Sequence, residues 1–216
     1  MKQISKLMFI MLLFILSGCT YQGNLRSDIY KTNKAISPLP IKAQMVWDSG
    51  LDSGKYTSGN IYENYNVEIT TNPGLKIAFQ NAMTEVFENV SIIDNISKIK
   101  ANEYRIILYP KIEVRSQEVF MRVTAKDSET DELIDKYEAS GNVKIDNPSS
   151  AKVLSVINII PCALLCTPFI APAINSIVGA KHQEDFEARV VENLKNIVNE
   201  MKMDRKLKAK YTSTNK

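Results

Sequence analysis

Apolar and polar residues alternate over several short stretches of this chain, and such alternation is typical of half-buried strands. Residues 41–47 (IKAQMVW) and 62–69 (YENYNVEI) both follow this pattern. The segment between them, residues 48–59, is rich in glycine and serine and therefore predicts a loop. The pattern predicts that the folded domain begins with two strands joined by a loop.

Two longer stretches space their apolar residues three and four positions apart, as an amphipathic helix does. The first follows Asn72 and Pro73, which suit a helix start, and its apolar residues are Leu75, Ala78, Phe79, Ala82, Met83, Val86, Phe87 and Val90. The second covers residues 183–203, and its apolar residues are Phe186, Val190, Leu194, Ile197, Val198 and Met201. Each stripe predicts a helix that packs on a sheet.

Alternation between these two helices predicts the rest of the sheet. A short strand is expected at residues 91–94 and a longer one at residues 104–114, in which Pro110 favours an edge position or a bulge. Residues 119–126 and 133–145 flank an acidic turn and predict a hairpin. The expected fold class is α+β, with one mostly antiparallel or mixed sheet and two amphipathic helices packed on one face.

The first nineteen residues have the pattern of an export signal. Lys2 and Lys6 precede the apolar run 7–16, which is too short to span a bilayer as a stable helix. The run ends in Leu-Ser-Gly-Cys19, which resembles the lipobox of bacterial lipoproteins. The resemblance implies that residues 1–18 are a signal peptide, that Cys19 carries a lipid anchor (palmitate or similar acyl groups), and that the mature chain starts there.

The residues that follow Cys19 predict a tether and a location. Residues 19–40 are polar, show no sustained helix or strand period, and end in a proline-rich segment. They are therefore expected to link the anchor to an α+β domain at residues 41–203. Residues 204–216 are expected to form a basic flexible tail. Thr20 differs from the aspartate that resembles an inner-membrane retention signal, which favours the periplasmic face of the outer membrane.

An uncharged stretch of 28 residues, 153–180, interrupts the domain before the closing helix. Its three prolines argue against one straight helix and favour two short arms, about residues 153–160 and 169–178, which form a helical-hairpin insert. The arms are internal core, a membrane-inserting hairpin, or an oligomer or partner surface, and all three alternatives stay open. The residues expected to contact membrane or partner are Ile159, Ile160, Leu164, Leu165, Phe169, Ile170, Ile174 and Ile177.

The charge and residue composition argue against several kinds of function. Loss of residues 1–18 lowers the formal net charge from +3 to +1, so nothing calls for nucleic acid. His182 is the only histidine, two cysteines do not make a zinc site, and no nucleophile turn is present, so we expect no metal, no cofactor and no enzymatic activity. Cys162 and Cys166 form a disulfide or remain free thiols, and both alternatives stay open.

The order of predicted elements, with the runs LKIAFQNAMTEVFENVSIID and YRIILYPKIEV, resembles the small α/β modules of bacterial envelope lipoproteins. These modules are similar to the anticodon-binding-domain-like fold of the curli-secretion lipoprotein and of the amino-terminal domain of the Tol-system periplasmic protein. The resemblance implies an adaptor or assembly factor of the envelope whose partners are envelope proteins or further copies of itself. An oligomeric pore or export subunit that inserts the 153–180 hairpin, and a lipid or glycolipid carrier, are the alternatives.

Overall fold

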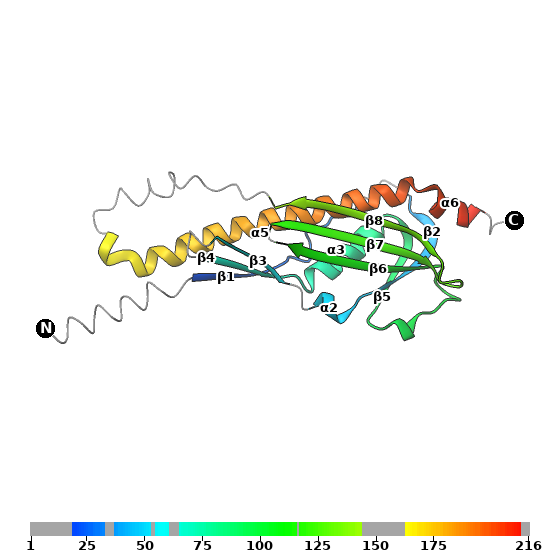
Figure 1. Cartoon of the computed structure of the whole chain (residues 1–216), viewed down its shortest axis with the longest axis horizontal. Coiled ribbons are helices and arrows are strands. Elements are labelled where there is room, and N and C mark those ends of the chain that lie inside the picture. The colour runs from blue at the N-terminus through cyan, green and yellow to red at the C-terminus, as the bar shows by residue number, and fades with distance from the viewer. Residues whose placement is uncertain are drawn as a thin grey trace.

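The structure is a computed structural model that describes residues 19–32, 37–52, 55–60, 65–115, 117–143 and 163–212. Two sheets lie one after the other along a single long helix, α5 (Ala163–Met203), which runs nearly the full length of the molecule (Figure 1). The described residues therefore form an α+β protein, and the predicted class is confirmed.

The larger sheet has five strands in the order β5-β2-β6-β7-β8. β2 pairs in parallel with both β5 and β6, whereas β6, β7 and β8 are antiparallel neighbours. Its strands are β2 (Leu39–Val46), β5 (Phe87–Ile93), β6 (Ile106–Arg115), β7 (Glu118–Asp127) and β8 (Leu133–Asn142). The predicted β7–β8 hairpin is confirmed.

The smaller sheet has three strands in the order β1-β4-β3, which are β1 (Cys19–Asn24), β4 (Tyr65–Thr70) and β3 (Lys55–Asn60). β1 pairs in parallel with β4, and β3 pairs with β4 as an antiparallel neighbour. The prediction of one sheet is wrong because β4 pairs with these two strands and not with β2. The glycine- and serine-rich composition of residues 48–59 hid β3, in which Tyr56 is buried between two exposed neighbours.

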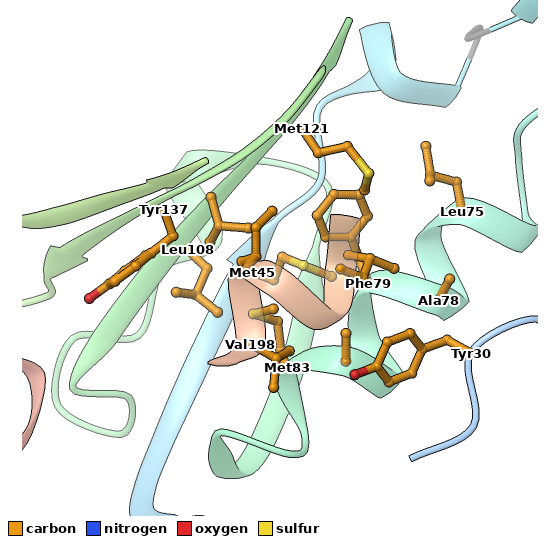
Figure 2. Close-up of a cluster of buried hydrophobic side chains, with 14 of the residues drawn as sticks. Tyr30, Met45, Leu75, Ala78, Phe79, Met83, Leu108, Met121, Tyr137 and Val198 are labelled. Carbon is orange, nitrogen blue, oxygen red and sulfur yellow. The ribbon is translucent and has the colours of Figure 1, made fainter. Parts of the chain in front are cut away.

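Helices α3 (Gly74–Met83) and α5 cover one face of the five-stranded sheet. Figure 2 shows Met45, Leu108 and Met121 of the sheet gathered around Phe79 of α3 and Val198 of α5. The ring of Trp47 meets that of Phe79 edge-on, with centroids 5.7 Å apart. All six apolar residues predicted for the closing helix are buried, so that prediction is confirmed. Two short helical elements, α2 (Ser49–Asp52) and η1 (Ile96–Lys98), lie in connections.

The predicted extent of the first helix is wrong at its end. α3 stops at Met83, and after a turn the chain enters β5 at Phe87. Phe87 and Val90 continued the helical spacing by coincidence, because both are buried from a strand, where Val90 pairs with Ala43. The break falls where β5 gains a partner strand, and the sequence between residues 75 and 90 carries no glycine or proline to mark it.

The tether predicted for residues 19–40 is wrong for most of that segment. Residues 19–24 form β1, Leu25 and Tyr30 are buried in the core, and β2 begins at Leu39. The chain therefore passes from Cys19 directly into the fold, with no polar spacer between them.

Two further boundaries differ from the prediction. Residues 205–212 form α6 (Arg205–Thr212), whose Leu207 is buried, so the predicted flexible tail is helical over most of its length. The second arm of the predicted hairpin is the start of α5, which continues without interruption into the closing helix through Pro168 and Pro172. The prediction of a separate second arm is therefore wrong. Residues 153–160, the predicted first arm, lie outside the described residues.

Candidate functional site

The residue predicted to carry the lipid, Cys19, is the first residue of β1. Cys19 pairs in register with Tyr65, and Tyr65 pairs with Asn60 of β3. The start of β1, the start of β4 and the end of β3 thus lie together at one end of the three-stranded sheet. We define this end of the sheet, with the first part of α5, as the anchor end.

The residues just after Cys19 pack directly on α5. Tyr21 lies against Gly179, where a Cβ atom would sit 2.0 Å from the Cγ atom of the tyrosine. The Tyr21 hydroxyl donates to Gln183 Oε1 at 2.9 Å, and Gln183 Nε2 donates to the carbonyl oxygen of Asn24 at 2.7 Å. β1 therefore lies beside α5, and only glycine at position 179 allows this approach.

An ion pair extends this contact along the helix. The Arg26 guanidinium donates to Glu187 at 2.8 Å, and the backbone amide of Arg26 donates to the other carboxylate oxygen at 3.2 Å. The Glu187 side chain is only 4% exposed, so it is desolvated while it binds both donors. The hydrogen bond and the negative charge of Glu187 raise the pKa of Arg26.

Leu25, which precedes Arg26, lies between β4 and the start of α3. Its amide donates to the carbonyl oxygen of Thr70 at 2.8 Å. Its carbonyl oxygen lies against Gly74 at the start of α3, where a Cβ atom would be 2.1 Å away. A side chain at position 74 would have to displace backbone, so glycine is required there.

A buried polar group holds the end of the same segment. Tyr30 donates its hydroxyl to Glu85 Oε1 at 3.2 Å, and Lys202 Nζ donates to Glu85 Oε2 at 2.8 Å. The Glu85 side chain is 7% exposed. Burial, followed by the charge of Glu85, raises the pKa of Tyr30. These three residues join the amino-terminal segment, the turn after α3 and the end of α5.

The first part of α5 extends past the start of β1 at the anchor end (Figure 1). Tyr21 lies level with Gly179, and β1 extends only two residues before Tyr21, about 7 Å of strand. The helix extends from Gly179 back to Ala163, about 24 Å. Residues 163–180 contain no charged side chain, and the first charge is that of Lys181.

The predicted contact residues divide between this helix and undescribed segments. Leu164, Leu165, Phe169, Ile170, Ile174 and Ile177 all lie on α5 before Gly179, as does Cys166 of the predicted disulfide. Ile159, Ile160 and Cys162 lie outside the described residues, so the Cys162–Cys166 disulfide stays a prediction. His182 is buried on α5 beside the three-stranded sheet. Within the described ranges, no cluster of three or more His, Cys, Asp or Glu side chains could hold a metal ion.

A second surface lies on the face of β6–β8 opposite the helices. Alternation along β7 buries Met121 and turns Phe120 and Arg122 to this outer face, where both are half-buried. Arg122 lies over the Phe120 ring, 5.2 Å from its centroid, and pairs with Glu138 of β8. We call this surface the outer sheet face.

Most of the residues that organise the anchor end could not be predicted from the sequence. Gln183 and Glu187 are four residues apart on the predicted closing helix, which indicates that they share a face. Their partners Tyr21 and Arg26 lie more than 150 residues earlier, and nothing local in the sequence links the two segments.

Comparison with known proteins adds a structural likeness. Neither a protein-family model nor a curated protein matches the chain. Among solved structures, the chain is similar to the crystal structure of protein XCC0632 from Xanthomonas campestris, of family DUF330, with a TM-score of 0.47 and 9% identity over 91% of this chain and 99% of that one. In the part of the chain that the structure describes, no helix is both long and apolar enough to cross a membrane.

Proposed function

We propose that the protein is an outer-membrane lipoprotein of the bacterial envelope that faces the periplasm and acts as an adaptor or assembly factor through protein contacts. The lipobox-like sequence before Cys19 supports the anchor. The role requires no chemistry on a substrate.

One observation carries this proposal: the candidate lipid site is the first residue of a strand that is packed into the fold. Hydrogen bonds from Tyr21, Arg26 and Leu25 hold the following segment to α5 and β4. A lipid on Cys19 would therefore restrict the orientations that the whole domain can take at the membrane surface. A restricted orientation suits a protein that presents a surface to a partner, because it lowers the entropy lost on assembly.

The surface presented would be the outer sheet face. It carries Phe120, Arg122 and Glu138, and arginine and aromatic side chains are enriched at the centres of protein interfaces. The long helices α3 and α5 both pack on the opposite face of this sheet.

Metabolic labelling with palmitate tests the anchor. The natural sequence should incorporate label and fractionate with the outer membrane, whereas Cys19→Ser should lose the label and remain folded. A wild-type protein that takes up no label, or that is found in the cytoplasm, would contradict the lipoprotein proposal.

Photo-crosslinking tests the adaptor role. A crosslinking residue placed at Lys111 or Lys136, exposed positions on the outer sheet face, should yield discrete adducts with envelope proteins. Lys195, an exposed position on α5, is the matched control and should yield none. Equal adduct patterns at all three positions would contradict a role for this face.

A further inference from the structure

We propose that the uncharged start of α5, residues 163–180, inserts into the membrane leaflet that holds the acyl chains of Cys19. The inference rests on the proposed lipoprotein anchor, and it assigns lipid as the partner of this helix end. α5 would then be both a structural helix of the domain and a second membrane contact that sets the orientation of the domain.

β1 and α5 run in the same direction, which is the first observation behind this proposal. Three contacts occur in the same order along both elements: Tyr21 with Gly179, Asn24 with Gln183, and Arg26 with Glu187. β1 and α5 therefore run side by side in parallel. Because of this, the amino-terminal end of α5 and Cys19 point out of the same end of the molecule (Figure 1).

The length of α5 beyond the level of Cys19 matches the thickness of one leaflet. Cys19 precedes Tyr21 by about 7 Å of strand, which corresponds to four or five residues of helix before Gly179, near Ile174 and Asn175. α5 continues past this level to Ala163, about 18 Å farther. The hydrocarbon core of one leaflet is about 15 Å thick. With Cys19 at the headgroups, the helix start would cross one leaflet and stop near the bilayer centre.

The sequence of α5 changes from apolar to charged near the level of Cys19. Residues 163–174 (ALLCTPFIAPAI) contain only threonine as a hydrogen-bonding side chain, and the polar Asn175 and Ser176 fall near the level of Cys19. Lys181, the first charged residue, lies on the domain side of that level and pairs with Asp185 at 2.7 Å. The change from apolar to charged sequence thus coincides with the proposed anchor, as expected of a helix that enters lipid at this point.

An apolar helix end of this length in water would be an aggregation liability, so something must cover it. A lipid leaflet fits better than a protein partner, because the acyl chains of Cys19 would bring the leaflet to this end of the molecule. Insertion would also prevent rotation of the domain about a single anchor, and the outer sheet face would keep one direction.

Vesicle flotation of the chain from residue 19 onward with Cys19→Ser tests insertion without acylation; all described elements lie in this range. Vesicles of phosphatidylethanolamine and phosphatidylglycerol should carry this protein to the top of the gradient. Ile170→Lys with Ile174→Lys should lower the floated fraction at least tenfold. The matched control adds the same two charges at exposed positions of the same helix, Asn196→Lys with Asn199→Lys, and should float like the parent.

Depth is read from fluorescence. Phe169→Trp should be quenched by lipids brominated in their acyl chains, and Trp47, only 1% exposed in the core, should supply an unquenched background.

Each outcome decides between lipid and protein. Failure of the folded parent to float, or equal flotation of both lysine pairs, would overturn insertion. A stable oligomer abolished only by the charges at Ile170 and Ile174 would instead show that another copy of the chain covers this end. Flotation of the Cys19→Ser protein does not depend on acylation, so failed palmitate labelling would overturn the proposed anchor alone.

Discussion

The two sheets along α5 are built differently, and the difference separates stability from position. The five-stranded sheet is covered by α3 and by the second half of α5, and this half of the molecule contains most of the largest fully buried side chains, among them Trp47, Phe79 and Tyr137. Among the described elements, α5 is the helix that packs on the three-stranded sheet, where Tyr56 stacks on Phe186 with ring centroids 4.4 Å apart.

Polar contacts take over where the apolar core becomes thin. Gln183 and Glu187 of α5 bind the segment around β1 by hydrogen bonds and an ion pair. Such contacts define geometry well but contribute less free energy than a dry core. We therefore expect the five-stranded half to determine the global free energy of unfolding, and the three-stranded half to open locally at lower cost.

The largest effect is expected in the five-stranded half. Phe79→Ala removes a ring that is 1% exposed and packs on Trp47, and should lower the free energy of unfolding by about 3–5 kcal/mol. Denaturant unfolding monitored by circular dichroism measures this loss. A loss below about 1 kcal/mol would show that the core is not centred on Phe79.

A somewhat smaller effect is expected at the carboxyl-terminal end of α5, where Lys202 contacts the turn after α3. Lys202→Met leaves the Glu85 carboxylate, 7% exposed, without its cationic partner and should cost about 3 kcal/mol. Adding Glu85→Gln should recover most of the lost free energy of unfolding, because residue 85 then carries no buried charge. If the double variant is no more stable than Lys202→Met alone, the pair does not act as a unit.

Gly179→Ala should act on the three-stranded half alone. The new Cβ would overlap the Tyr21 ring, and overpacking of this kind costs about 1–3 kcal/mol locally. Limited proteolysis near β1 should become faster while the global unfolding midpoint hardly changes. Tyr21→Ala in the same chain should relieve the overlap, and Gly50→Ala, whose Cβ would meet only ordinary contacts, is the control.

The smallest effect is expected in alkaline solution. Burial, followed by the hydrogen bond to Asp204, raises the pKa of Tyr137, whose hydroxyl donates to Asp204 at 2.6 Å. Above about pH 10 the unfolded chain releases this proton and the folded chain keeps it, so the free energy of unfolding should fall as pH rises. Tyr137→Phe should reduce that slope by at most about 1 kcal/mol per pH unit. Identical slopes between pH 9.5 and 11 would contradict this role.

Long regular patterns made part of the fold predictable. The β7–β8 hairpin and the closing helix follow from periods sustained over ten or more residues. β1 and β3 are six residues each and contain glycine, so their alternation was too short to detect. The end of α3 was missed because Phe87 and Val90 continue the helical spacing from a strand.

The anchor end was predictable only at its one sequence signal, Cys19. The groups that fix its position join residues distant in sequence, such as Arg26 with Glu187, which are 161 positions apart. Surface ion pairs of similar composition occur all along the chain, and burial of the Glu187 side chain distinguishes this pair. Burial depends on the assembled fold and cannot be read from neighbouring residues.

Amide hydrogen exchange over residues 21–25 tests most directly whether Cys19, the proposed lipid site, begins the folded domain. In the chain from residue 19 onward, the Leu25 amide, which donates to Thr70 at 2.8 Å, should exchange about 100-fold or more slowly than an unstructured peptide. Gly74→Ala, which displaces the Leu25 carbonyl, should abolish much of that protection. Exchange of residues 21–25 at the unprotected rate in the natural sequence would show a flexible tether and contradict a restricted orientation at the membrane.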